Sequence, residues 1–121
     1  MTYGVALRLE RGLVFAADTR TNAGVDNIAQ YRKLQFWRKP GDRVLVLLSA
    51  GNLGVTQSVL SLLNEQLTLE APDQTHLFNA PNMFRAARVV GDAVRECRRV
   101  DGQALETSKA GFAASFIFGG Q

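Results

Sequence analysis

The chain has 121 residues, of which 46% are hydrophobic and 21% are charged, and its formal net charge is +3 at pH 7. This length suits one domain, and the composition is typical of a soluble globular protein. No apolar run reaches the roughly 18–20 residues of a membrane span, and the first residues lack the charged and apolar regions of a signal peptide. We therefore expect one cytoplasmic domain over residues 1–121, without a membrane partner.

The first segments predict a β-hairpin. Residues 3–9 alternate between apolar and other side chains, which is the period of a half-buried strand. Glu10-Arg11-Gly12 is typical of a tight turn, and residues 13–17 are continuously apolar, which predicts a strand buried on both faces. Because the two strands are antiparallel and similar in length, Thr2 and Asp18 are expected at the same end of the hairpin.

A second apolar strand is predicted at residues 44–48, after the turn signal Pro40-Gly41-Asp42. Ser49-Ala50-Gly51 ends this strand, and Asn52 can cap the helix that follows. Such a corner gathers backbone N–H groups, so Gly51 could belong to an oxyanion hole or could simply satisfy turn geometry. Lys33, within a more apolar stretch at residues 28–37, could likewise be a site residue or a surface lysine.

Two helices and a last strand complete the pattern. Apolar residues at helical spacing predict a helix over residues 53–69, which Pro72 prevents from continuing. Asn79-Ala80-Pro81 is typical of a second helix start. Residues 101–109 are predicted to form a polar loop, and residues 111–119 an apolar strand. This order indicates an α+β fold with helices on one face of an antiparallel sheet.

The second predicted helix carries a basic stripe, formed by Arg85, Arg88, Arg95, Arg98 and Arg99. A nucleic-acid surface is one interpretation. A solvated or subunit-facing stripe is favoured instead, because acidic residues share the helix and no aromatic residues interleave for base stacking. The single cysteine, Cys97, excludes an internal disulfide and has no companions for a metal site, so it is expected to be a buried apolar side chain.

The N-terminus carries the clearest chemistry. If Met1 is removed, Thr2 holds a hydroxyl and a free α-amine on one residue, and the amine can act as the base that activates the hydroxyl. A nearby lysine ammonium would lower the pKa of that amine, because like charges disfavour protonation. Lys33 suits this role, and a carboxylate such as Asp18 would keep the lysine charged and oriented.

Several of these segments resemble one known family. They are the start Thr2-Tyr3-Gly4-Val5-Ala6-Leu7, residues 12–26 with Asp18-Thr19-Arg20, the triplet Tyr31-Arg32-Lys33, residues 44–57 with Ser49-Ala50-Gly51, and residues 111–120. In this order they are similar to the proteasome β-subunit superfamily, and more closely to its bacterial ancestral-β-subunit branch, the Anbu family.

The resemblance implies an N-terminal nucleophile (Ntn) hydrolase with an αββα sandwich, of which this chain would supply the first half, as antiparallel strands and two helices. It implies Thr2 as the nucleophile after Met1 removal, Asp18 and Lys33 in the site, and the Gly51 N–H as an oxyanion donor. No metal or organic cofactor is implied. Peptides or unfolded proteins would be substrates, like subunits would form a homo-oligomer, and an ATPase partner is possible by analogy.

The leading functional hypothesis is therefore a threonine-type peptidase. The family's chains run well past the end of this one, so residues 1–121 are interpreted as a single truncated domain. The alternative is a catalytically incompetent fragment or assembly subunit of a proteasome-like particle. A conventional Ser/His/Asp hydrolase using Ser49 and His76 ranks third, because the sequence lacks a nucleophile-elbow motif.

Overall fold

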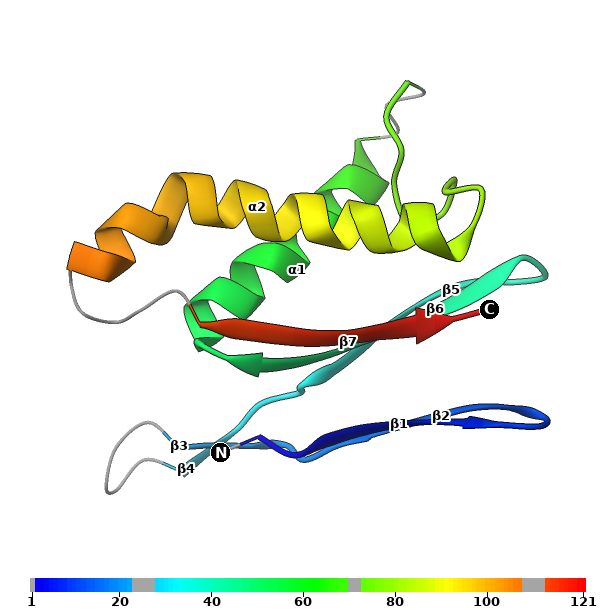
Figure 1. The fold of residues 1–121 in the computed structure, drawn as a ribbon, viewed down its shortest axis with the longest axis horizontal. Coiled ribbons are helices and arrows are strands. Elements are labelled where there is room, and N and C mark those ends of the chain that lie inside the picture. Colours follow the sequence, from blue (N-terminus) through cyan, green and yellow to red (C-terminus); the bar gives the residue numbers. More distant parts are fainter. Residues whose placement is uncertain (1, 23–27, 70–72, 108–112) are drawn as a thin grey trace. The chain divides into compact units, whose positions relative to one another are not determined.

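The computed structural model describes residues 2–22, 28–69, 73–107 and 113–121, and its class is α+β as predicted (Figure 1). Contacts divide the chain into two compact units, Met1–Ala50 with Ser115–Gln121, and Gly51–Ala114. The elements in chain order are β1 (Gly4–Leu9), β2 (Gly12–Ala17), β3 (Arg20–Asn22), β4 (Ile28–Gln30), β5 (Leu34–Lys39), β6 (Arg43–Gly51), α1 (Leu53–Thr68), α2 (Met83–Thr107) and β7 (Ala114–Gly120).

Strands β1 and β2 form the predicted antiparallel hairpin, with Gly4 opposite Ala17 and Leu9 opposite Gly12. The predicted burial of these strands is wrong. Val5, Leu7 and Leu9 of β1 are exposed, and so are Leu13 and Val14 of β2. The alternating pattern correctly predicts a strand, but no described part of the chain buries its apolar side chains.

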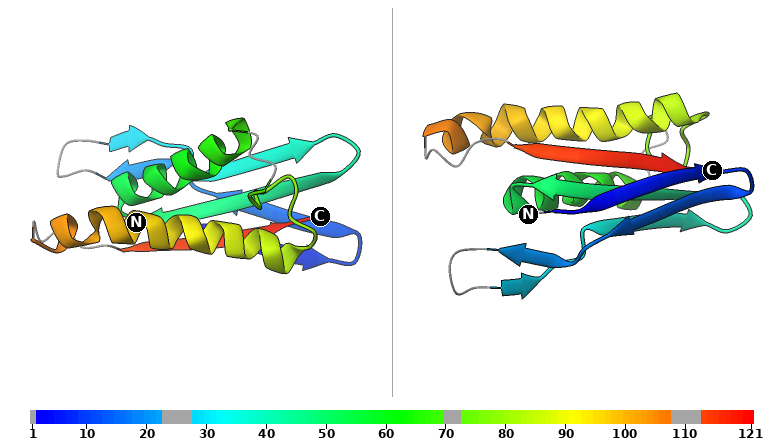
Figure 2. Two further views of the ribbon diagram at one scale, coloured as in Figure 1. Left: turned by 90° about the horizontal axis from the view of Figure 1, so that it is seen from above. Right: turned by 60° about the horizontal axis from the view of Figure 1, so that its bottom comes forward.

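The other strands form a two-stranded and a three-stranded sheet, the latter in the order β5-β6-β7 (Figures 1 and 2). In the three-stranded sheet, β5 and β6 are antiparallel, with Leu34 opposite Leu48. Val44 and Gln121 exchange backbone hydrogen bonds of 2.8 and 2.9 Å at the end of β7. The predicted strands at residues 44–48 and 111–119 therefore exist with shifted limits, and residues 111 and 112 lie outside the described part.

The hairpin contacts the three-stranded sheet at two glycines. A Cβ on Gly4 would lie 3.5 Å from Leu48 Cδ1, and a Cβ on Gly119 would come within 2.6 Å of the Phe15 ring. Glycine at residue 119 therefore lets the aromatic ring lie directly on the β7 backbone. These contacts assign one face of the hairpin to the sheet.

Helix α1 agrees with the predicted span. The Asn52 side chain accepts a hydrogen bond of 3.2 Å from the Val55 N–H, which satisfies one of the free donors at the helix start. Val55, Val59 and Leu63 lie one turn apart and are buried, so they form the apolar face of this helix.

Helix α2 differs from the prediction at both ends. It begins at Met83 rather than at Asn79 to Pro81, because the Asn82 side chain accepts the Arg85 N–H at 2.9 Å and acts as the cap. It continues to Thr107, so a loop at residues 101–107 was wrongly predicted; residues 108 and 109 are outside the described part. Good helix formers such as Gln103, Ala104 and Leu105 support this extension.

The face that α2 buries includes Ala86, Val89, Val90, Ala93 and Cys97, and α2 packs against α1 within their unit. Cys97 is buried as expected. Among the helices that the described residues form, neither has a stretch long and apolar enough to span a bilayer.

Truncating the centre of the α1 apolar face should destabilise the protein. Leu63 is fully buried, so Leu63→Ala is expected to lower the free energy of unfolding by about 2–5 kcal/mol. Urea denaturation followed by circular dichroism measures the change. Leu69, just after the same helix, is exposed, so Leu69→Ala is the matched control and should change stability by less than about 0.5 kcal/mol. Equal effects of the two substitutions would contradict the assigned core.

Candidate functional site

At one end of the hairpin, the residue before β1 forms hydrogen bonds with Asp18. The Asp18 N–H donates to the Tyr3 carbonyl at 3.0 Å, and the Tyr3 N–H donates to Asp18 Oδ1 at 2.7 Å. This continues the ladder one step past the pairing of Gly4 with Ala17. Thr2 precedes Tyr3, and consecutive Cα atoms are about 3.8 Å apart. The half-buried Thr2 is therefore adjacent to the residue that Asp18 binds.

Lys33 joins this end of the hairpin from the segment before β5. Its Nζ lies 2.7 Å from Asp18 Oδ2, and its side chain is only 5% exposed. The Ser49 N–H donates to the Lys33 carbonyl at 2.9 Å, so β6 fixes the lysine backbone. The contributions of the Tyr3 and Ser49 backbones were not predicted, because residue type carries no signal for main-chain hydrogen bonds between distant segments.

These contacts determine the charge of Asp18. The hydrogen bond from Lys33 lowers the pKa of Asp18 to about 2, and the backbone N–H groups of Tyr3 and Arg20 act in the same direction. Burial opposes them by disfavouring the charged form. Asp18 is therefore ionised near neutral pH, and its negative charge faces the Lys33 amine.

Gly51 is the last residue of β6 and belongs to the other compact unit. Its φ is 108°, which favours glycine, and a Cβ there would lie 2.3 Å from the Ala113 carbonyl oxygen. The neighbouring Asn52 N–H donates to that same oxygen at 2.7 Å. Glycine is thus required for backbone geometry, and its part in an oxyanion hole stays a prediction.

The side chains of Ser49 and His76 form hydrogen bonds with backbone groups. The Ser49 hydroxyl donates to the Lys33 carbonyl at 3.4 Å. His76 Nδ1 accepts the Phe78 N–H at 3.1 Å. These contacts give both side chains structural roles and add no support to a Ser/His/Asp hydrolase.

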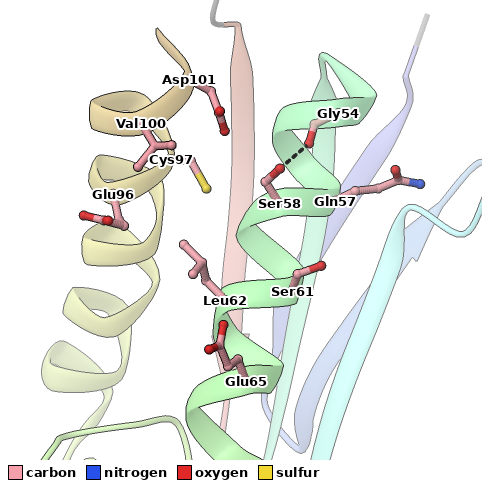
Figure 3. Close-up of a pocket in the computed structure, with 10 residues that line it drawn as sticks. All are labelled: Gly54, Gln57, Ser58, Ser61, Leu62, Glu65, Glu96, Cys97, Val100 and Asp101. Atoms are coloured by element: carbon pink, nitrogen blue, oxygen red, sulfur yellow. Dashed lines mark hydrogen bonds between the residues drawn. The ribbon is translucent and has the colours of Figure 1, made fainter.

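An open groove of about 450 Å³ lies between α1 and α2, a feature that the sequence pattern did not predict (Figure 3). The residues that line it include Glu65, Glu96, Cys97 and Asp101. Burial raises the pKa of the Cys97 thiol, and the negative charges of Asp101 and Glu96 raise it further. The thiol therefore stays protonated near neutral pH and is a poor nucleophile.

The lowered pKa of Asp18 predicts acid sensitivity. Because its pKa falls from 3.8 to about 2 on folding, ionised Asp18 stabilises the protein above about pH 4, and this contribution is lost as the pH falls toward 2. Asp18→Asn should remove this part of the pH dependence and lower stability near neutral pH. Urea titrations at pH 6, 3.5 and 2.5 measure it. Asp73→Asn controls for the lost charge, and identical pH profiles for wild type and Asp18→Asn would contradict the assignment.

Comparison with known proteins gives strong structural matches. No protein-family model and no curated protein sequence matches the chain. Among solved structures, a mutant Anbu (Gly-1) from Hyphomicrobium sp. strain MC1 is 68% identical with a TM-score of 0.86. Anbu, the ancestral beta-subunit, from Yersinia bercovieri is 44% identical with a TM-score of 0.84. The Anbu complex from Pseudomonas aeruginosa, solved as a helical assembly, is 41% identical with a TM-score of 0.83.

These matches cover 100% of this chain, but only 47% of the Hyphomicrobium chain and 48% of each of the other two. The chain thus spans about half the length of the relatives it matches. Within that half, identity and backbone similarity are both high. Over its whole length, the chain therefore matches about half of Anbu, the ancestral β-subunit, a proteasome-type protein.

Proposed function

We propose that this chain carries the nucleophile-bearing part of a threonine-type peptidase, with Thr2 as the N-terminal nucleophile once Met1 has been removed. The observation that supports this most is the double role of Asp18. Its carboxylate binds the N–H that follows Thr2 and the Lys33 amine, each at 2.7 Å. A nucleophile candidate, a cation and a carboxylate thus come together at one end of the hairpin.

The proposed reaction begins with proton transfer within Thr2. The neutral α-amine takes the hydroxyl proton as Oγ attacks the carbonyl carbon of the scissile peptide bond, forming a tetrahedral oxyanion. Collapse of this intermediate breaks the C–N bond, and the α-ammonium returns the proton to the leaving amine. Water then attacks the resulting ester, with the α-amine again as the base, and releases the acid product and free Thr2.

Lys33 and Asp18 would support these steps through charge. A buried ammonium near Thr2 favours the neutral form of the α-amine and stabilises negative charge on the attacking oxygen. Ionised Asp18 holds that ammonium in place. The Gly51 N–H would stabilise the oxyanion, which is the role that the resemblance implies for this residue.

The proposal extends to the fold, the substrates and the assembly of the complete protein. The complete fold would be the Ntn-hydrolase αββα sandwich, and the substrates would be peptides or unfolded proteins in the cytoplasm. The Pseudomonas relative forms a helical assembly, which supports a homo-oligomer of like subunits here.

One observation favours the alternative of a catalytically incompetent fragment or assembly subunit. The matches cover about half of each relative, so residues that complete a site in those proteins could lie outside the matched part. The experiments below separate this alternative from a working site.

Intact mass spectrometry before and after incubation with a peptide epoxyketone tests the nucleophile. We expect loss of Met1 and one stoichiometric adduct on wild type, because such reagents require an N-terminal hydroxyl and amine together. Thr2→Ala should form no adduct, whereas Thr2→Ser, which keeps a hydroxyl, should still form one. Retained Met1 or an unmodified wild type would favour the incompetent subunit, and an adduct on Thr2→Ala would exclude the mechanism.

Removing the lysine charge should slow the same reaction. Lys33→Ala is expected to lower the rate of adduct formation at least about 100-fold, which is typical for loss of a group that assists proton transfer. The rate is measured by mass spectrometry over time, and circular dichroism checks that the variant folds. Lys39, an exposed lysine of β5, provides the control Lys39→Ala, which should react like wild type. A folded Lys33→Ala that reacts at the wild-type rate would remove Lys33 from the site.

A further inference from the structure

The groove between α1 and α2 is long enough for a short peptide. Both helices belong to one compact unit, and the residues of α1 that line the groove lie between Gly54 and Glu65. A second hollow of about 350 Å³ shares Gly54, Ser58 and Asp101 with it, so the open space continues toward the start of α1. Because an α-helix rises about 1.5 Å per residue, residues 54–65 extend over roughly 17 Å. An extended chain of about five residues has that length.

The groove is negatively charged on a protein whose net charge is positive. Its lining contains Glu65, Glu96 and Asp101, and no described residue that lines it is basic. Glu96 is paired with Arg99 at 2.7 Å. Glu65 and Asp101 are exposed, and neither forms an ion pair with any residue in the described part of the chain. Two negative charges are therefore left uncompensated here, although the formal net charge of the chain is +3.

Apolar surface lies between these two charges. In Figure 3, the side chains of Leu62 and Cys97 lie between the helices. Glu65 is nearer to one end of the groove, and Asp101 is nearer to the other. Val100 also lines the groove and is 58% exposed, so its apolar surface is accessible. An apolar centre with negative charge at both ends is complementary to an apolar side chain that is flanked by positive charges.

We propose that this groove binds an extended cationic segment of a partner protein, in which an apolar residue is flanked by lysine or arginine. The apolar side chain packs against Leu62 and Val100, and the flanking cations pair with Glu65 and Asp101. Burial of the apolar side chain provides most of the affinity, whereas exposed ion pairs contribute little and mainly select a cationic partner. This inference concerns binding by the two helices, so it stands independently of the proposed catalysis.

Selection from a peptide library tests the proposal. A phage-displayed library of random peptides is selected on the immobilised 121-residue chain. We expect the enriched peptides to share an apolar residue flanked by lysine or arginine. The most enriched peptide is then synthesised with a fluorescent label, and fluorescence anisotropy gives its dissociation constant. The double variant Glu65→Gln, Asp101→Asn should raise this constant about tenfold, because two ion pairs are lost.

Matched variants identify the groove as the binding site. Glu10→Gln combined with Asp73→Asn removes two charges at exposed residues outside the groove, and this control should bind the peptide like wild type. Val100→Ser removes apolar surface without changing charge and should also weaken binding. Circular dichroism checks the folding of each variant.

Two kinds of outcome would overturn the proposal. One is failure to enrich a cationic motif, or equal binding of the peptide by wild type and by the folded groove variants. The other is a dimer of wild type that the Glu65 and Asp101 substitutions dissociate, since a second copy of the chain would then be the occupant.

Discussion

The ion pair between Asp18 and Lys33 is the constraint on which the site depends. A nearly buried ammonium needs an opposite charge close by, because its desolvation is otherwise unfavourable. Asp18 provides that charge at 2.7 Å. The hairpin register positions the aspartate, and the hydrogen bond from Ser49 positions the lysine backbone. Three segments distant in sequence are thereby fixed at one point, next to Thr2.

Stability alone is a weak reason for this arrangement. Replacing a buried ion pair by apolar residues of similar volume is often neutral or stabilising, because desolvating two charges offsets most of their attraction. The proposed proton transfer at Thr2 would give the pair a more specific role, and strongly perturbed titrating groups such as Asp18 gather at functional sites. The carboxylate also binds the Tyr3 N–H, so the same group that orients the lysine orients the backbone of the candidate nucleophile.

The sequence predicted those features that depend on local pattern. Alternation and a short turn gave a hairpin with Asp18 near Thr2, and Asn52 was recognised as a helix cap. The burial of Lys33 was left open, because its surroundings are assembled from distant segments. The start of α2 was misplaced because Pro81 suits a first helical turn, whereas the side-chain acceptor is on Asn82. The exposure of the hairpin was missed because an alternating pattern shows which side chains favour burial. It does not show whether another segment is present to bury them.

The exposed apolar side chains of the hairpin lie close in sequence to two residues of the candidate site, Thr2 before β1 and Asp18 after β2. Val5 is two residues from Tyr3, and Ala16 is two residues from Asp18, so motion of the hairpin moves the site directly. Positioned catalysis loses much of its rate when reacting groups shift by about 1 Å, and a hairpin packed on one face only is the less rigid arrangement. Packing against the exposed apolar side chains of the hairpin would therefore do more than remove apolar surface from water. It would hold Thr2 and Asp18 in register, so the order of the candidate site would depend on how fully the hairpin is packed.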